Sequence, residues 1–253
     1  SEAEGERMQR TLRTAAAQFA TEFDSEISRL LISLQVDGPT TRDENWRAYA
    51  ERYSRWTTTA AEPRIVRDVW LVDTLPGTPL PAIDASNPVP IDRLRLRKWN
   101  VPAMTFEPAE WPADLEQMRG SFAHRFIGFS VQRSRPGEAN VHREASLSLA
   151  VGDDATLISP VTLFELPDHD GPSPKMPKIT VLGFTIIRLE PAVIRDTMLT
   201  SLAARHFHGN DTEVNYRVAI VERDDRSKAV WESEPGIAKT VAASPDVTQA
   251  FMG

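Results

Sequence analysis

The chain of 253 residues contains no cysteine. This absence excludes disulfide bonds, thiol nucleophiles and metal sites with cysteine ligands. It fits the cytoplasm and a bacterial envelope equally well. The chain also lacks an apolar run of about 18 residues, the length that crosses a membrane. It has no secretory signal peptide at its start.

Positive charge is also scarce. The chain has 29 Lys and Arg against 36 Asp and Glu, which gives a formal net charge of −7. Domains that bind nucleic acids usually carry a basic stripe, so we expect no nucleic-acid partner. Hydrophobic residues make up 41% of the chain and charged residues 26%. Such values are typical of a soluble globular protein.

The motifs that mark catalytic and nucleotide-binding sites are missing. The sequence contains no G-x-S-x-G elbow, P-loop, dinucleotide fingerprint or H-E-x-x-H. His206 and His208, beside Asp211, could share a metal if they lay in an extended segment. We favour a helix end there, where histidine suits the helix dipole. We therefore expect no catalytic residue, no metal and no cofactor in this chain.

The first feature that is present is a long apolar stripe near the N-terminus. Its members recur at steps of three and four, the spacing of one helical face. They are Met8, Leu12, Ala16, Phe19, Phe23, Ile27, Leu30 and Leu34. The spacing predicts a helix from about Glu4 to Gln35, stopped by Asp37-Gly38-Pro39.

The stripe also repeats every eleven residues, as Leu12, Phe23 and Leu34 do. An eleven-residue repeat keeps a stripe nearly straight along the helix. We expect Met8 and Leu12 to face a sister helix, and Phe23 to Leu34 to face the domain. On this hypothesis the stripe is a signal-transmitting element.

Local patterns predict a mixed series of further elements. Trp46, Tyr49, Tyr53 and Trp56 lie on one broad face of a helix over 43–60, with Asp43 as its N-cap, and predict core packing. A second helix should begin near Ala113. Strands are expected at 64–73, 91–101, 145–151, 155–166 and 178–189. A helix over 191–207, ended by Gly209, and a hairpin of 214–223 with 228–234 should complete the chain.

This order of elements predicts an α+β fold, in which a long N-terminal helix packs on a mostly antiparallel sheet. We divide the chain into a stalk helix at 1–36, a first α+β module at 37–140 and a second, strand-rich module at 141–253.

The segment 91–101 carries the most distinctive side chains. Arg93, Arg95 and Arg97 alternate with leucines, as on a half-exposed strand. Arginines two residues apart on one strand face can fork onto a carboxylate or phosphate. The alternative is a solvated sheet face whose arginines pair with acidic neighbours. The candidate ligand-binding residues are Arg95, Arg97, Trp99, Trp70 and Trp111.

The second half of the chain, from "ITVLGFTIIRLEPAVIRD" through "RVAIVERDDRSKAVWESEPG", resembles a known pattern. Its matching positions are 187–190, 199–208, 216–223 and 230–235. In the first half, "WRAYAERYSRW", "VRDVWLVD" and "FEPAEWPADLEQMR" follow in the same order. The pattern is that of extracytoplasmic sensor regions of bacterial, acidobacterial-type membrane sensor histidine kinases.

That resemblance implies a PAS-like or Cache-like sheet behind a long helix, in the periplasmic or extracellular part of an inner-membrane receptor. It also implies a homodimer in the full-length receptor, an unknown small-molecule or protein signal, and no catalysis by this chain itself. Two alternatives stay open. One is a module that senses a protein partner, and the other is a free-standing enzyme with an unfamiliar site.

Overall fold

A computed structural model describes most of the chain, with several gaps. The described residues are 2–80, 88–126, 128–130, 155–165, 178–207, 216–222 and 225–250. The chain divides into two compact units, which we call unit 1 and unit 2. Unit 1 comprises Ser1–Ile32, Leu149–Thr156 and Leu189–Gly253, and unit 2 comprises Ser33–Ser148 and Leu157–Arg188. The α+β fold with a long N-terminal helix is confirmed.

The N-terminal helix α1 runs over Glu2–Leu34, 33 residues, close to the predicted bounds. Burial increases along its apolar stripe. Met8 is 49% exposed and Leu12 is half-buried, whereas Phe23 is 1% and Leu34 is 0% exposed. The stripe is therefore buried mainly from Phe19 onward.

Within the described ranges, no helix combines the length and apolarity that crossing a membrane requires.

Unit 1 also contains a second helical segment, which matches the predicted 191–207. It consists of α5 (Pro191–Val193), a π-helical turn η3 (Ile194–Leu199) and α6 (Thr200–Phe207). The hydroxyl of Thr200 donates to the carbonyl of Arg195, five residues earlier, at 3.2 Å. This bond spans the wider turn, in keeping with the extra residue of a π-helix.

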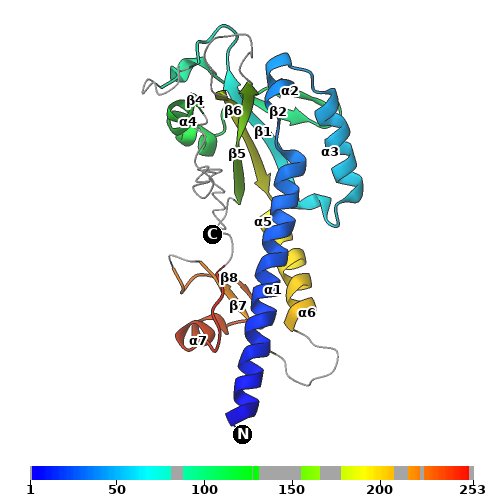
Figure 1. Cartoon of the computed structure of the whole chain (residues 1–253), viewed down its shortest axis with the longest axis vertical. Helices are drawn as coiled ribbons and strands as arrows, with labels where there is room; N and C mark the ends of the chain where they lie inside the picture. The colour runs from blue at the N-terminus through cyan, green and yellow to red at the C-terminus, as the bar shows by residue number, and fades with distance from the viewer. Residues whose placement is uncertain are drawn as a thin grey trace, which may run out of the picture. The chain divides into compact units, whose positions relative to one another are not determined.

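The C-terminal part of unit 1 is a hairpin followed by a short helix (Figure 1). Strands β7 (Ala219–Val221) and β8 (Ala229–Glu232) pair antiparallel, which confirms the predicted hairpin. Helix α7 spans Ala238–Ala243 and was not predicted. The carboxylate of Glu232 accepts the backbone N–H groups of Gly236 at 2.7 Å and Ala238 at 2.9 Å, so it ties the hairpin to the start of α7.

Unit 2 is built around a six-stranded sheet with the order β3-β2-β1-β6-β4, in which β5 also pairs with β6. The pairs β1/β2, β2/β3 and β4/β6 are antiparallel. The strands are β1 (Val66–Thr74), β2 (Leu94–Asn100), β3 (Thr105–Pro108), β4 (Gly128–Ser130), β5 (Thr156–Glu165) and β6 (Lys178–Leu189).

This sheet corrects the predicted division at residue 140. Strands β5 and β6 were assigned to a separate second module, but β6 lies beside β1 in the sheet of the first. Gly183 of β6 approaches β1 so closely that an added Cβ would lie 2.4 Å from the carbonyl oxygen of Val72. The unit boundary instead follows the ends of these two strands, because Thr156 and Leu189 belong to unit 1.

Helices cover both faces of the sheet in unit 2 (Figure 1). On one face, α4 (Ala113–Arg125) brings Phe122 against Phe184, with ring centroids 5.2 Å apart. This face holds a cluster that includes Trp70, Val72, Leu94 and Leu96. On the other face, α3 (Arg47–Thr59) places Tyr49 against Trp99 at 4.7 Å. The predicted core role of Trp46, Tyr49 and Trp56 is confirmed, since all are buried.

Two local predictions are wrong. Asp43 does not cap α3, because it is the last residue of a short helix α2 (Gly38–Asp43). Asp37 caps that helix instead, accepting the N–H of Thr40 at 2.8 Å, so the predicted stop signal also begins a new helix. Arg93 lies in the 3-10 turn η2 (Ile91–Arg93) rather than in the strand. The predicted strand 145–151 and Gly209 lie outside the described residues.

Candidate functional site

The predicted arginine pair lies on the α3 face of the sheet in unit 2. Asp73 of β1 stands opposite Arg95 of β2 in the antiparallel register. Arg95 forks onto Asp73, with its Nε and Nη2 each 2.8 Å from a carboxylate oxygen. Arg97 lies 3.2 Å from the same carboxylate and also hydrogen bonds to Glu44. Glu44 in turn accepts from Arg95 at 3.0 Å. Two arginines and two carboxylates therefore form one closed cluster.

Glu44 reaches this cluster from an unusual backbone position. It is the C-cap of α2 and adopts the left-handed conformation, with φ 49° and ψ 31°. Its backbone N–H bonds to the carbonyls of Thr40 and Thr41, which closes the helix. Its side chain then lies across the sheet arginines. The same residue therefore ends α2 and attaches it to the sheet of unit 2.

The part of the cluster that lies on the sheet is buried, whereas the side chain of Glu44 is half-exposed. The side chains of Arg97 and Asp73 are 4% and 5% exposed, and the guanidinium of Arg97 stacks over the ring of Trp46 at 5.4 Å. Burial raises the pKa of Asp73 to about 6, against the lowering effect of Arg95. Asp73 is thus ionised at neutral pH and balances the arginines. An anionic ligand would have to displace Asp73 or Glu44.

The three candidate tryptophans do not join the arginines in one site. Trp99 packs among the aromatic rings under α3, such as Phe106 at 5.0 Å. Trp70 points to the opposite face of the sheet, where Lys98 lies over its ring at 4.9 Å. Trp111 is half-buried beside α4, with Arg119 over its ring at 5.0 Å. Trp70 and Trp111 therefore belong to the cluster on the α4 face of the sheet, whereas Trp99 lies on the α3 face with the arginines.

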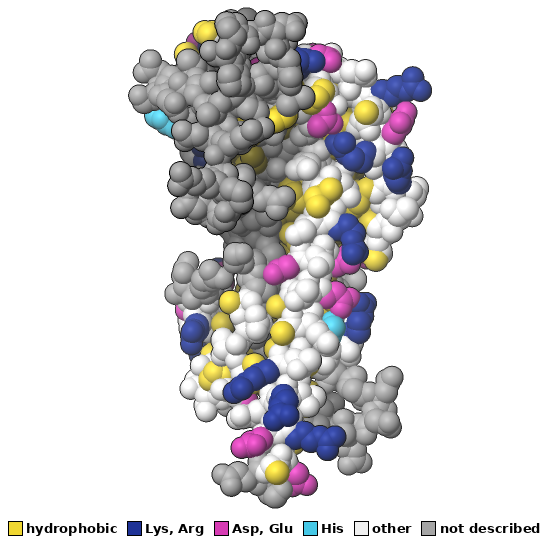
Figure 2. Space-filling view, in the orientation of Figure 1, with side chains coloured by type: hydrophobic (Ala, Val, Ile, Leu, Met, Phe, Trp, Pro, Cys, Tyr) yellow, Lys and Arg dark blue, Asp and Glu magenta, His cyan; other side chains and the backbone are white. Residues whose placement is uncertain are grey.

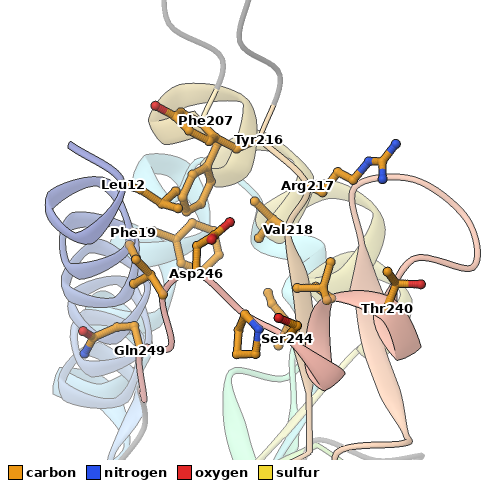
Figure 3. A pocket seen from close by; sticks show the side chains of 16 residues that line it. Leu12, Phe19, Phe207, Tyr216, Arg217, Val218, Thr240, Ser244, Asp246 and Gln249 are labelled. Carbon is orange, nitrogen blue, oxygen red and sulfur yellow. The ribbon is translucent and has the colours of Figure 1, made fainter. Parts of the chain in front are cut away.

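A pocket of about 410 Å³ lies in unit 1 (Figure 3). Side chains of α1, the end of α6, the β7 segment, α7 and the C-terminal segment surround it. The lining residues are Leu12, Ala16, Phe19, Phe207, Tyr216–Ile220, Thr240, Val241, Ser244–Val247 and Gln249. Its volume falls in the range of small-molecule sites, about 300–1,000 Å³.

The floor of the pocket is apolar and aromatic. Phe19 and Phe207 are each 4% exposed, and their ring centroids are 5.7 Å apart. Tyr216 meets Phe207 edge-on at 6.5 Å. Leu12, one turn before Ala16, completes the α1 wall of the pocket. Leu12 thus faces a pocket of its own unit, which corrects the expectation that it faces a sister helix.

Two charged residues occur among the described lining, Arg217 and Asp246. Arg217 is exposed, lies 3.9 Å from a carboxylate oxygen of Glu234, and points away from the pocket in Figure 3. The carboxylate of Asp246 points into the pocket, toward Phe207 and Phe19 (Figure 3). Among the described residues that line the pocket, Arg217 is the one cation, and its partner is Glu234 rather than Asp246. The pocket therefore presents a negative group above an aromatic floor.

His206 lies in the last turn of α6, as the favoured interpretation of a helix end predicted. Its Nε2 is 2.6 Å from a carboxylate oxygen of Glu22 in α1. Burial, then the charge of Arg205, lower the pKa of His206, so the neutral ring donates this hydrogen bond. Arg205 also pairs with Glu22. His208 and Asp211 lie outside the described residues, and among the described ones no three potential metal ligands gather.

Charges on the described surface are mixed. The face in Figure 2 shows Lys and Arg side chains interspersed with Asp and Glu. Comparison with known proteins gives no significant match to a family model, a curated protein or a solved structure. The pocket in unit 1 is the best candidate site because it combines an apolar, aromatic lining with a carboxylate.

Proposed function

We propose that this chain is the extracytoplasmic, PAS-like or Cache-like signal-sensing region of a bacterial two-component sensor histidine kinase. In the intact receptor it would be periplasmic or extracellular, membrane-anchored and paired as a homodimer. Its own role would be to bind a signal, while catalysis would belong to another part of the receptor. The resemblance of its sequence to such regions motivates the proposal.

The observation that carries the proposal is that one wall of the pocket is α1 itself. Leu12, Ala16 and Phe19 line the pocket, so a ligand there contacts the longest helix of the chain directly. The same helix continues without a break to Leu34. A ligand that prefers one setting of α1 over another shifts the population of the two settings. Such a shift, passed along a continuous helix, would be the input to the kinase.

The packing around the pocket supports a movable α1. The stripe is only half-covered at Leu12, although it is buried at Phe23. Further along α1, Glu22 pairs with His206 and Arg205 of α6, and these polar contacts can rearrange. A helix held tightly at one end and loosely at the other responds to a ligand at the loose end.

The full-length protein provides the test. We expect an apolar span of about 20 residues on each side of this region and a phospho-acceptor histidine region after the second. In membranes, Leu12→Trp should fill the pocket and change autophosphorylation severalfold. The matched control Thr11→Trp, on the exposed face of the same helix, should leave it unchanged. A full-length protein without membrane spans and kinase region would refute the proposal.

A further inference from the structure

We propose that the pocket in unit 1 binds an organic ammonium ion with an apolar body. The sensory role of the pocket rests on the proposed function, and the inference adds the class of ligand. It depends on three features of the described residues, namely the shape of the pocket, its aromatic floor and the sign of its charge.

The first feature is a partly open hollow that separate elements line. Helix α1, the end of α6, the β7 segment, α7 and the C-terminal segment all contribute side chains to a space of about 410 Å³. That volume accommodates a small organic molecule rather than a metal ion. The walls contributed by Leu12, Val218 and Val241 are apolar. A ligand therefore gains most of its affinity by burying an apolar body.

The second feature is the aromatic floor. Phe19, Phe207 and Tyr216 bring three rings to one pocket, and successive centroids are 5.7 and 6.5 Å apart. The faces of aromatic rings attract cations, and sites for alkylated ammonium groups are built from such rings. A carboxylate gains no such attraction from the face of a ring.

The third feature is the charge. Asp246 points into the pocket, whereas the guanidinium of Arg217 points away and has Glu234 as its partner (Figure 3). A cationic ligand would pair with Asp246 at the point where the rings stabilise it as well. The net charge of −7 for the whole chain adds a general attraction for cations. These charges select against an anion of the same shape.

The remaining polar lining residues fit the same ligand. Thr240, Ser244 and Gln249 also line the pocket, lie within six residues of Asp246 in the sequence and offer hydroxyl and amide oxygens. Such oxygens accept hydrogen bonds from the N–H groups of a primary or secondary ammonium ion. They would orient the ligand without adding charge. The arrangement favours an ammonium head between Asp246 and the aromatic rings, with the apolar body along Leu12, Val218 and Val241.

The test uses three probes of similar shape and different charge: phenethylamine, phenethyl alcohol and hydrocinnamate. Titration calorimetry with the purified chain should give the tightest binding for phenethylamine, about tenfold tighter than the alcohol. Hydrocinnamate should bind weakest. In Asp246→Asn the amine should lose this advantage and bind within about twofold of the alcohol. Asp246 is exposed, so the variant should fold normally.

The matched control is Asp196→Asn, an exposed carboxylate of the same unit that lies outside the pocket. It should keep the full preference for the amine. Leu12→Trp should abolish binding of all three probes. If that variant does not fold, Ala16→Leu, which narrows the same wall, replaces it.

Several results would overturn the inference. Equal affinity for amine and alcohol would do so, as would a preference that survives in Asp246→Asn, or a lack of binding by every probe at millimolar concentration. The proposed function fails separately. If the full-length protein binds the amine but has no kinase region, the ligand site is supported and the sensor role is refuted. A preference for hydrocinnamate that Leu12→Trp abolishes removes the amine and leaves the sensor role.

Discussion

The two units differ in the partners of one prominent group of charged side chains in each. In unit 2, Asp73 and Glu44 neutralise Arg95 and Arg97 within the chain, and Asp73 and Arg97 are buried on the sheet. In unit 1, Asp246 faces a pocket, and the one cation among the described lining residues pairs with another carboxylate. A closed cluster fixes the position of the elements that carry it, whereas an open carboxylate is available to a ligand. The arginines that looked functional in the sequence are structural, and the inconspicuous aspartate is the better binding candidate.

The largest contrast should come from the two ends of the α1 stripe. Leu34 is fully buried in unit 2, and Leu12 is half-buried beside the pocket of unit 1. Leu34→Ala should lower the free energy of unfolding by about 3–4 kcal/mol, because a cavity remains. Leu12→Ala should lower it by less than about 1 kcal/mol. Urea unfolding followed by tryptophan fluorescence measures both, and equal costs would show that the pocket is filled.

The next effect concerns the closed cluster. Arg97→Ala should lower the free energy of unfolding by about 3 kcal/mol, because the buried Asp73 and the half-exposed Glu44 lose a cation. Arg47→Ala is the control, since that arginine of α3 is exposed in its pairing with Glu51. Chemical denaturation at neutral pH should leave the Arg47 variant at the wild-type midpoint. A wild-type midpoint for Arg97→Ala as well would mean that the cluster does not hold unit 2 together.

A smaller effect should appear in the pH dependence of stability. Burial raises the pKa of Asp73 from 3.8 to about 6, so the folded protein holds this proton more tightly than the unfolded chain does. The stability that this group contributes is present below about pH 4 and is lost as the pH rises through about 6. Asn at this position mimics the protonated carboxyl.

Relative to Asp73→Asn, the wild type should therefore lose about 2 kcal/mol of unfolding free energy between about pH 4 and pH 7. Denaturation curves of both proteins across this range provide the measurement. A difference that does not vary with pH would show that Asp73 does not titrate in this window.

The smallest effect is expected in unit 1. The hydroxyl of Thr200 accepts the indole N–H of Trp231 at 3.1 Å and donates to the carbonyl of Arg195. Thr200→Val removes both bonds near the surface and should cost about 0.5 kcal/mol. Trp231 is the tryptophan of unit 1, and the other five lie in unit 2. Its fluorescence, isolated by comparison with Trp231→Phe, reports unfolding of unit 1; a cost above about 2 kcal/mol would contradict this prediction.

Periodic patterns predicted most elements because they depend on local spacing. The bounds of β6 and of the helical segment 191–207 agree with the sequence prediction, and α1 differs by only a few residues. Strong apolar periodicity, with Pro191 at the helix start, is sufficient for such segments. The short strand β3 and helix α7 were missed because four and six residues carry too little periodicity.

The environment of the candidate residues depended on pairings that local spacing does not encode. Alternation placed Arg95 and Arg97 on one strand face, but Asp73 meets them only through the β1/β2 register. Glu44 meets them only because α2 ends in a left-handed residue. The pocket joins Leu12 to Asp246, residues from the two ends of the chain. Among the aromatic residues of the pocket, Phe19 was predicted only as a member of the apolar stripe.

Glu44 has a consequence for the way this chain can vary in evolution. A left-handed position at a helix end usually accepts glycine or asparagine most easily. Substitution by glycine would relax the backbone but would leave Arg97 without one of its two carboxylates. Positions 44 and 97 should therefore covary. A relative with glycine at the first is expected to carry an uncharged residue at the second.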